Sequence, residues 1–237
     1  MRFLALLLGA VTLVTSSPGC AAAAAAGIGG GDRPQVIQLH RFRKALWTIR
    51  VDYRGVEGDF LFDTGGGMTL LSAAFAKAVD CHYWGRTTGF NMFGERSDGA
   101  HCDGVKLTAD RVALSAVDAG SIDFADRFSG DKAPDGLLAL DAFDGKAITI
   151  DQAAGTLTIE TPGSLARRVK GMTPLPFRLA RECSSRCLDA FVGAPTREGL
   201  AWFTLDSGAG GVSLVAKHNA RLFGMDDAAA MLITLGM

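Results

Sequence analysis

The feature that most constrains this chain is a short pattern that occurs twice, around Asp63 and around Asp206. The first copy reads Gly-Asp-Phe-Leu-Phe-Asp-Thr-Gly-Gly-Gly, and the second reads Leu-Ala-Trp-Phe-Thr-Leu-Asp-Ser-Gly-Ala-Gly. In both copies, apolar residues lie one and three places before the aspartate, as in a strand with one face in the core. The glycines that follow allow a tight turn. The repeat predicts two related lobes, residues 35–160 and 172–237, joined by a connection over 161–171.

Short apolar runs separated by turn residues make up much of the remaining chain. Trp47, Ile49 and Val51 alternate with polar residues, which is the period-two pattern of a half-buried strand. Similar runs lie at 36–39, 45–53, 56–62, 104–107, 111–116, 147–150 and 156–159. Helical patterns are confined to residues 72–79, 164–169 and 212–223. The expected fold is therefore all-β and antiparallel, with short helices at its edges.

Composition limits the classes of partner. The 237 residues are 48% hydrophobic and 21% charged, which is enough apolar material for a real core. The net charge is −1, and no long Lys/Arg run occurs, so the sequence offers no electrostatic surface for nucleic acid or anionic lipid. We expect a peptide or small-molecule partner.

The N-terminus has the features of an export signal over residues 1–26. Arg2 supplies a positive charge, an apolar run covers residues 3–14, and small residues follow. Residues 27–34 are predicted to be a flexible linker. Ser17-Pro18-Gly19-Cys20 resembles part of a bacterial lipobox, so lipidation at Cys20 and simple cleavage stay open as alternatives. The protein is expected to be exported, either periplasmic or anchored as a lipoprotein, and to meet the membrane only through that anchor.

Four cysteines remain after the N-terminal one is set aside, an even number suited to an oxidising compartment. We expect two disulfides, Cys81–Cys102 and Cys183–Cys187. The second spacing is not that of a thioredoxin-like redox pair, so this bridge is predicted to be a structural staple across a hairpin.

Other chemistries have less support in the sequence. Cys81-His82 and His101-Cys102 suggest a Cys/His metal site, but neighbours on an extended chain point to opposite faces. The sequence lacks Gly-x-Ser-x-Gly, His-Glu-x-x-His and a Walker lysine. We therefore expect no metal and no organic cofactor.

Taken together, these residues resemble the aspartic peptidases, specifically retropepsin-like and pepsin-like proteins in their bacterial exported form. The resemblance covers about 125 residues: the strands before Asp63-Thr64-Gly65, a short helix from Ser72, a central hairpin, and the segments 135–141 and 148–151. It implies an aspartic-protease-like β-barrel lobe followed by a second, incomplete lobe.

The resemblance also implies roles for single residues. Asp63 and Asp206 would form a catalytic dyad that shares one proton and activates a water for attack on a peptide bond. The residues expected to support this dyad are Thr64, Gly65, Ser207 and Gly208. A flap over the cleft would span residues 88–100, with its tip near Gly94, and Phe90 and Phe93 on it could line the cleft.

Three departures from the family pattern keep other interpretations open. Gly67 and Gly210 replace a Ser or Thr that usually orients the aspartate, and Ala139 replaces a usual Gly. Only 31 residues follow Asp206 (237 minus 206), so we expect a truncated second lobe. The alternatives are a non-catalytic peptide-binding or scaffold protein, and a homodimer whose dyad consists of two copies of Asp63. The sequence leaves the oligomeric state undetermined.

Overall fold

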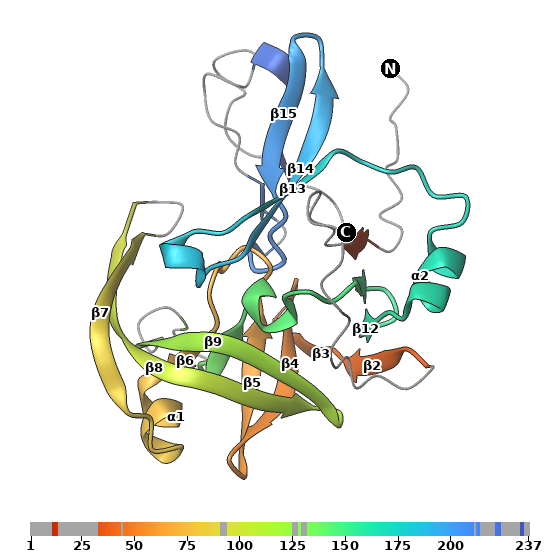
Figure 1. Ribbon diagram of the computed structural model, residues 1–237. Helices are drawn as coiled ribbons and strands as arrows, with labels where there is room; N and C mark the ends of the chain where they lie inside the picture. The colour runs from red at the N-terminus through yellow and green to blue at the C-terminus, as the bar shows by residue number, and fades with distance from the viewer. Residues whose placement is uncertain are drawn as a thin grey trace.

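The structure of the protein, a computed structural model, consists mainly of β-strands (Figure 1). It describes residues 33–43, 45–90, 94–124, 128, 132–210 and 221–223, together with the backbone of residues 11–13, 212–213 and 233–234. The α-helices, α1 (Ala73–Ala78) and α2 (Pro162–Arg168), are short. This confirms the all-β fold class. Within these ranges, no helix is long and apolar enough to cross a membrane.

The largest sheet has eight strands in the order β3-β4-β5-β10-β6-β9-β8-β7. Its strands are β3 (His40–Phe42), β4 (Leu46–Tyr53), β5 (Val56–Phe62), β6 (Leu70–Ser72), β7 (Tyr83–Phe90), β8 (Arg96–Ala109), β9 (Val112–Ile122) and β10 (Gly136–Leu138). β10 runs parallel to β5, and β6 runs parallel to β9. A further pairing between Asp52 on β4 and Thr108 on β8 curls the sheet into a partly closed barrel.

The core lies inside this curled sheet. On β4, Ile49 and Val51 are buried, whereas Arg50 is exposed and pairs with Asp59 on β5 at 3.1 Å. The largest fully buried side chains are Phe60, Phe62, Ile37, Ile49, Leu71, Leu107, Leu114, Leu138, Ile148, Leu157, Val51 and Val105. Burial of each of these side chains contributes on the order of 1.5–3 kcal/mol. Two of them, Phe60 and Phe62, lie on β5, so the first motif follows one of the best-packed strands in the molecule.

A second sheet has four strands in the order β1-β11-β12-β2. The strands are β1 (Val11–Leu13), β2 (Gln35–Gln38), β11 (Ile148–Asp151) and β12 (Thr156–Ile159). β1 belongs to the segment expected to be the export signal, and its backbone pairs antiparallel with β11.

Both helices begin at side-chain caps. The Ser72 hydroxyl accepts a hydrogen bond from the Phe75 N–H at the start of α1 (3.1 Å). Thr161 and Ser164 form a reciprocal capping box at the start of α2, with Pro162 in its first turn. The helices predicted at 72–79 and 164–169 are confirmed.

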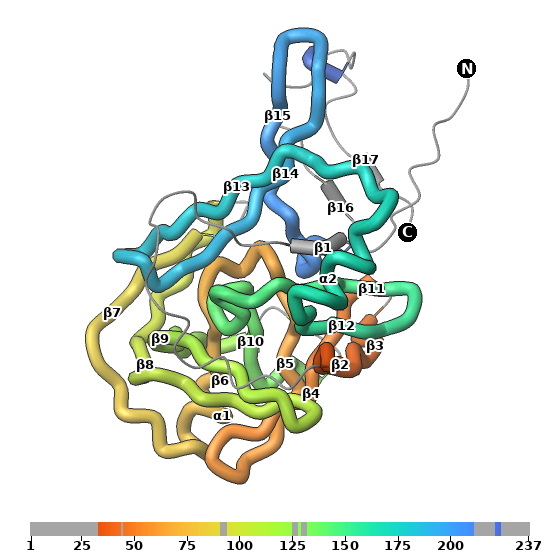
Figure 2. The backbone as a smooth tube through the Cα atoms, turned by 45° about the vertical axis from the view of Figure 1, so that its right-hand side comes forward, coloured from red at the N-terminus to blue at the C-terminus, as the bar shows by residue number. Residues whose placement is uncertain are grey.

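A separate three-stranded sheet precedes the second motif; its first strand packs on the main core, and its β14–β15 hairpin projects away from the large sheet (Figures 1 and 2). Its strands are β13 (Phe177–Ala180), β14 (Asp189–Thr196) and β15 (Gly199–Thr204). Among the described residues, the 3-10 helices are η2 (Leu140–Phe143), η3 (Cys183–Ser185) and η4 (Arg221–Phe223). In the three-stranded sheet, β14 pairs antiparallel with both β13 and β15.

The prediction of a helix over 212–223 is wrong at residues 212–213, and its central part, residues 214–220, lies outside the described residues. Val212–Ser213 forms strand β16, which pairs with β17 (Ile233–Thr234), and Arg221–Phe223 forms the 3-10 helix η4. β-branched Val212 suits a strand once a partner strand is present, and that partner lies too far along the chain for a local pattern to reveal. Leu205 packs against the main core, and Phe223 contacts Phe203 at 5.5 Å between ring centroids.

Both expected disulfides are present. Cys81 and Cys102 join the end of α1 to β8, with their Cα atoms 5.7 Å apart. Cys183 and Cys187 close the loop between β13 and β14, with Cα atoms 5.5 Å apart. Two bridges suggest an oxidising compartment, outside the cytoplasm. Within the described ranges, no group of three or more His, Cys, Asp or Glu side chains is arranged to hold a metal ion.

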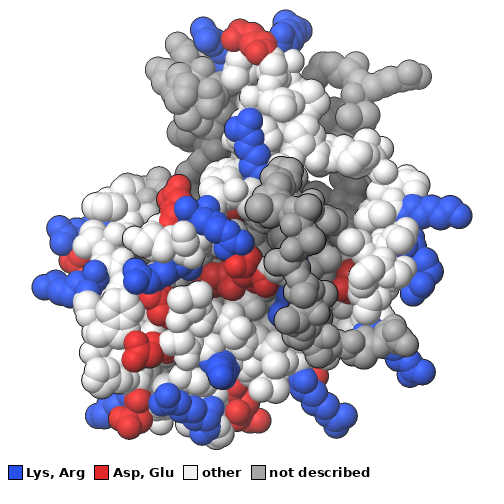
Figure 3. All heavy atoms as spheres, viewed as in Figure 1, with Lys and Arg blue, Asp and Glu red and all other residues white. Residues whose placement is uncertain are grey.

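Charged side chains of both signs are interspersed over the face drawn in Figure 3. Neither the basic nor the acidic residues form a continuous field on that face, as the net charge of −1 would suggest.

Candidate active site

Each motif aspartate lies just after the end of a strand, where backbone hydrogen bonds hold the chain. β5 ends immediately before Asp63, whose N–H donates to the Leu138 carbonyl on β10 (3.0 Å). β15 ends two residues before Asp206, and the intervening Leu205 donates its N–H to the Ala190 carbonyl on β14 (2.8 Å). Both aspartates therefore start from fixed backbone positions.

The two motif turns are locked to each other by a reciprocal set of hydrogen bonds. The Thr64 N–H donates to the Ser207 Oγ (3.1 Å), and the Ser207 N–H donates to the Thr64 Oγ1 (3.0 Å). Each hydroxyl then donates to a carbonyl just before the other motif: Thr64 Oγ1 to Leu205 (2.5 Å), and Ser207 Oγ to Phe62 (2.9 Å). Two turns that are 143 residues apart in the sequence thus form one unit, as the family resemblance implied.

The motif glycines allow the two carboxyl groups to approach. A Cβ on Gly65 would lie 2.6 Å from the carboxyl carbon of Asp206, and a Cβ on Gly208 would lie closer still to that of Asp63. The Gly65 N–H donates to Asp63 Oδ1 (2.9 Å), and the Gly208 N–H donates to Asp206 Oδ1 (2.8 Å). No residue other than glycine fits either position without moving an aspartate.

The carboxyl groups of Asp63 and Asp206 form a hydrogen-bonded pair. Burial, the charge of Asp206 and a side-chain hydrogen bond with Asp206 together raise the pKa of Asp63 from its ordinary 3.8 to about 7. Hydrogen bonds from the N–H groups of Gly65 and Gly208 lower the pKa of Asp63. Asp63 therefore keeps its proton well above the ordinary pKa of an aspartate, since two adjacent carboxylates cannot both ionise cheaply.

Backbone geometry gives a physical reason for the departures at Gly67 and Gly210. Both residues lie four places after the motif aspartate, and both have positive φ angles, 69° and 64°. Ser or Thr would be strained there. Backbone N–H groups of Gly65 and Gly208, rather than a hydroxyl at this position, hold the Asp63 carboxyl.

A buried carboxyl group that sequence reasoning missed supports the loop after Asp63. Asp141 accepts hydrogen bonds from the Thr69 hydroxyl (2.7 Å) and the Thr69 N–H (3.1 Å). The Thr69 hydroxyl also accepts from the N–H of buried Ala139 (3.3 Å). Burial raises the pKa of Asp141 to about 6. In the sequence, the sign of this buried carboxyl group is a single acidic residue inside the apolar run Leu-Leu-Ala-Leu-Asp-Ala-Phe.

The hairpin expected to form a flap consists of β7 and β8, paired as far as Phe90 with Arg96. Phe90 is 68% exposed, and Gly94 has a φ of 77° near the turn. Phe93, predicted to line the cleft, lies outside the described residues. The Cys81–Cys102 disulfide closes the base of this hairpin.

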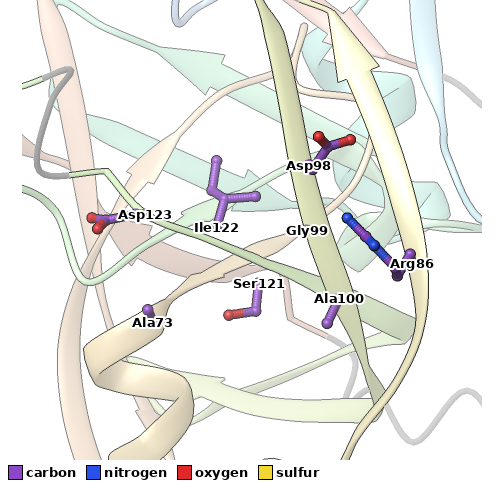
Figure 4. A pocket seen from close by; sticks show the side chains of 8 residues that line it. All are labelled: Ala73, Arg86, Asp98, Gly99, Ala100, Ser121, Ile122 and Asp123. Carbon is purple, nitrogen blue, oxygen red and sulfur yellow. The ribbon is translucent and has the colours of Figure 1, made fainter.

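An open recess of about 300 Å³ lies beside the middle of the β7–β8 hairpin (Figure 4). Arg86 and Asp98 approach it from the hairpin, and Asp123 lies across from them (Figure 4). The remaining lining residues are Ala73, Gly99, Ala100, Ser121 and Ile122.

Comparisons with known proteins give a limited result. No family model matches the chain, and no curated protein matches it. Among solved structures, it is similar to a retropepsin-like aspartic protease from Rickettsia conorii, at 16% identity and a TM-score of 0.38. The match covers 54% of this chain and 89% of that protein. Similarity at this level carries no information on activity, so functional inference rests on the geometry of the site.

Proposed function

We propose that this protein is an aspartic-type endopeptidase that hydrolyses peptide bonds with a water activated between Asp63 and Asp206. The observation that supports the proposal most strongly is the reciprocal locking of Thr64 and Ser207, which brings two distant carboxyl groups into hydrogen-bond contact. A pair that holds one proton contains an acid and a base side by side, which is what addition of water to an amide requires.

The proposed reaction uses both states of the pair. The ionised carboxyl accepts a proton from the bound water as its oxygen attacks the scissile carbonyl carbon. The protonated carboxyl donates a hydrogen bond to the carbonyl oxygen as negative charge develops there. When the tetrahedral intermediate collapses, the C–N bond breaks and the nitrogen takes up the proton received from water. No metal or organic cofactor is needed for these steps.

The hydrogen-bond pattern favours a dyad within one chain. Asp63 already has Asp206 as its partner, so a second copy of the chain is not required to complete the pair. We propose the β7–β8 hairpin as the flap over a bound peptide. We also propose an exported location, with lipid attachment at Cys20 as the one route to the membrane, and the two disulfides agree with an oxidising compartment.

The proposal is tested by incubating the purified protein with a peptide mixture from pH 3 to pH 8, in ¹⁸O-labelled water, with and without EDTA. We expect internal cleavage that is strongest in acid, insensitive to EDTA, and accompanied by one ¹⁸O atom in each new carboxyl group. Peptide binding without cleavage would support the non-catalytic alternative, and cleavage abolished by EDTA would contradict the dyad mechanism.

A further inference from the structure

A cluster of buried polar side chains lies at the base of the flap hairpin. Asp118 on β9 and His101 on β8 have side chains only 4% and 8% exposed, with 3.6 Å between His101 Nδ1 and Asp118 Oδ2. Trp84 on β7 stacks on the imidazole, at 4.7 Å between ring centroids. Arg186, from the loop between β13 and β14, reaches the same carboxylate, with Nε 2.9 Å from Asp118 Oδ2.

The contact between Arg186 and Asp118 depends on charge rather than on aligned hydrogen bonds. Within the described chain, neither carboxylate oxygen of Asp118 has a hydrogen-bond partner, and the N–H of Arg186 is not directed for one despite the short distance. A carboxylate this deeply buried is costly unless a cation lies beside it. Arg186 supplies that cation, and its guanidinium also lies over the Trp84 ring at 5.3 Å.

Arg186 lies at the start of a segment that contacts both motifs. Two residues later, the Leu188 N–H donates to the Gly67 carbonyl in the loop after Asp63 (2.7 Å). Two residues further on, the Ala190 carbonyl accepts from Leu205, the residue before Asp206. Residues 186–190 therefore link the flap base, the first motif and the second motif.

We infer that Arg186 and Asp118 are positioning residues for the proposed peptidase reaction, holding segment 186–190 so that the flap base and both aspartate turns keep their relative placement. The inference rests on the proposed function. Neither residue is proposed to touch the substrate. Their effect passes through the Leu188 and Ala190 backbone bonds to the two motif loops.

The pair depends on the ionisation of Asp118. Burial raises the pKa of Asp118, whereas the charges of His101 and Arg186 lower it. Asp103, also on β8, raises it, and Asp118 in turn raises the pKa of Asp141 on η2. Acidification through the raised pKa removes the carboxylate charge and with it the attraction to Arg186.

The same loop provides a matched control. Arg181 forms a bidentate pair with Asp144, at 2.7 and 2.6 Å, with both side chains more than 40% exposed. Removing an exposed pair has little effect, so Arg181→Gln should change kcat less than about twofold. Arg186→Gln should lower kcat roughly 10- to 100-fold with little change in KM, because small misplacements of catalytic groups are costly.

Asp118→Asn is a second variant that breaks the same pair. It leaves no unpaired buried anion, so the protein should still fold. It should lower kcat as Arg186→Gln does, whereas Arg186→Lys, which keeps the charge, should restore most of the rate. The ratio of wild-type to Asp118→Asn kcat should fall towards one as the pH drops, because wild-type Asp118 then becomes neutral. A ratio independent of pH, or equal losses in Arg181→Gln and Arg186→Gln, would contradict a positioning role.

A measurement without turnover separates this inference from the proposed function. In ¹³C NMR titrations of the Asp63 carboxyl, Arg186→Gln should move the midpoint down by about half a pH unit or more as water gains access. Arg181→Gln should leave the midpoint in place. An unchanged midpoint in Arg186→Gln overturns the inference, whereas a shifted midpoint in a protein without peptidase activity overturns only the proposed function.

Discussion

Thr64 and Ser207 exchange hydrogen bonds with each other's backbone N–H groups, at 3.1 and 3.0 Å, although 143 residues separate them in the sequence. Thr64 is 1% exposed, so this exchange takes place in the interior. It couples the fold to the candidate chemistry, because any loosening of these hydrogen bonds also separates Asp63 from Asp206.

The first prediction concerns the Thr64 hydroxyl. Thr64→Val keeps the shape of the side chain but leaves the Ser207 N–H and the Leu205 carbonyl without their partner. We expect the free energy of unfolding, measured by urea titration, to fall by about 1–3 kcal/mol. Thr64→Ser keeps the hydroxyl and is the control. Equal losses in the two variants would show that the hydroxyl does not hold the turns together.

The second prediction concerns the glycine that faces Asp63. Gly208→Ala introduces a methyl group onto the Asp63 carboxyl carbon and should reduce peptidase activity at least 100-fold, an effect on the order of 3 kcal/mol on the barrier. Gly145→Ala is a control for backbone strain, because Gly145 has a positive φ of 73° and no neighbour within 4 Å of an added Cβ. It should affect stability by about 1–2 kcal/mol and leave turnover intact. Activity in Gly208→Ala near that of Gly145→Ala would argue against close approach of the carboxyl groups.

The third prediction follows from the raised pKa of Asp63. The folded protein keeps a proton up to about pH 7 that the unfolded chain loses near pH 4, so the stability from this group is complete below pH 4 and is lost as the pH rises through 7. The Tm should therefore fall between pH 4 and pH 8. In Asp63→Asn this fall should be smaller, by about 1–3 kcal/mol of unfolding free energy. Identical pH profiles for the two proteins would show that Asp63 is not the group responsible.

The fourth prediction concerns the two disulfides, which close loops of different length. Replacing Cys81 and Cys102, 21 residues apart, with alanine should cost about 3 kcal/mol of unfolding free energy in the loop-entropy model. Replacing Cys183 and Cys187, four residues apart, should cost about 2 kcal/mol. Guanidinium unfolding measures both, after mass spectrometry of the non-reduced protein has verified the bridges. Four free thiols, or a larger loss from the shorter loop, would contradict this account.

Local pattern predicted the parts of the site that depend on short-range rules. Alternating apolar residues predicted the strand before Asp63, whereas the meeting of Thr64 and Ser207 was implied by the family resemblance that the repeated Asp-Thr/Ser-Gly carries. The even set of cysteines predicted both bridges.

The features that could not be predicted from the sequence depend on residues far apart in the chain or on the backbone conformation. Val212 lies in a strand because of Ile233–Thr234, and a helical pattern over 212–223 does not reveal that pairing. Asp118 and Arg186 are 68 residues apart in elements of different type, so no spacing rule joins them. The positive φ of Gly67 is likewise a backbone property, and the sequence showed only the absence of a hydroxyl.

The most direct test of the central claim is the kcat/KM for one cleaved peptide at acidic pH, compared among wild type, Asp63→Asn, Asp206→Asn and Asp59→Asn. Asp59 is the matched control because it lies on the same strand as the first motif but pairs with Arg50 at the surface. We predict that Asp63→Asn and Asp206→Asn each lose at least about 10³-fold, since each removes half of an acid–base pair, while Asp59→Asn stays within about twofold of wild type. Retention of activity in either dyad variant, with the protein still folded, would contradict a mechanism based on Asp63 and Asp206.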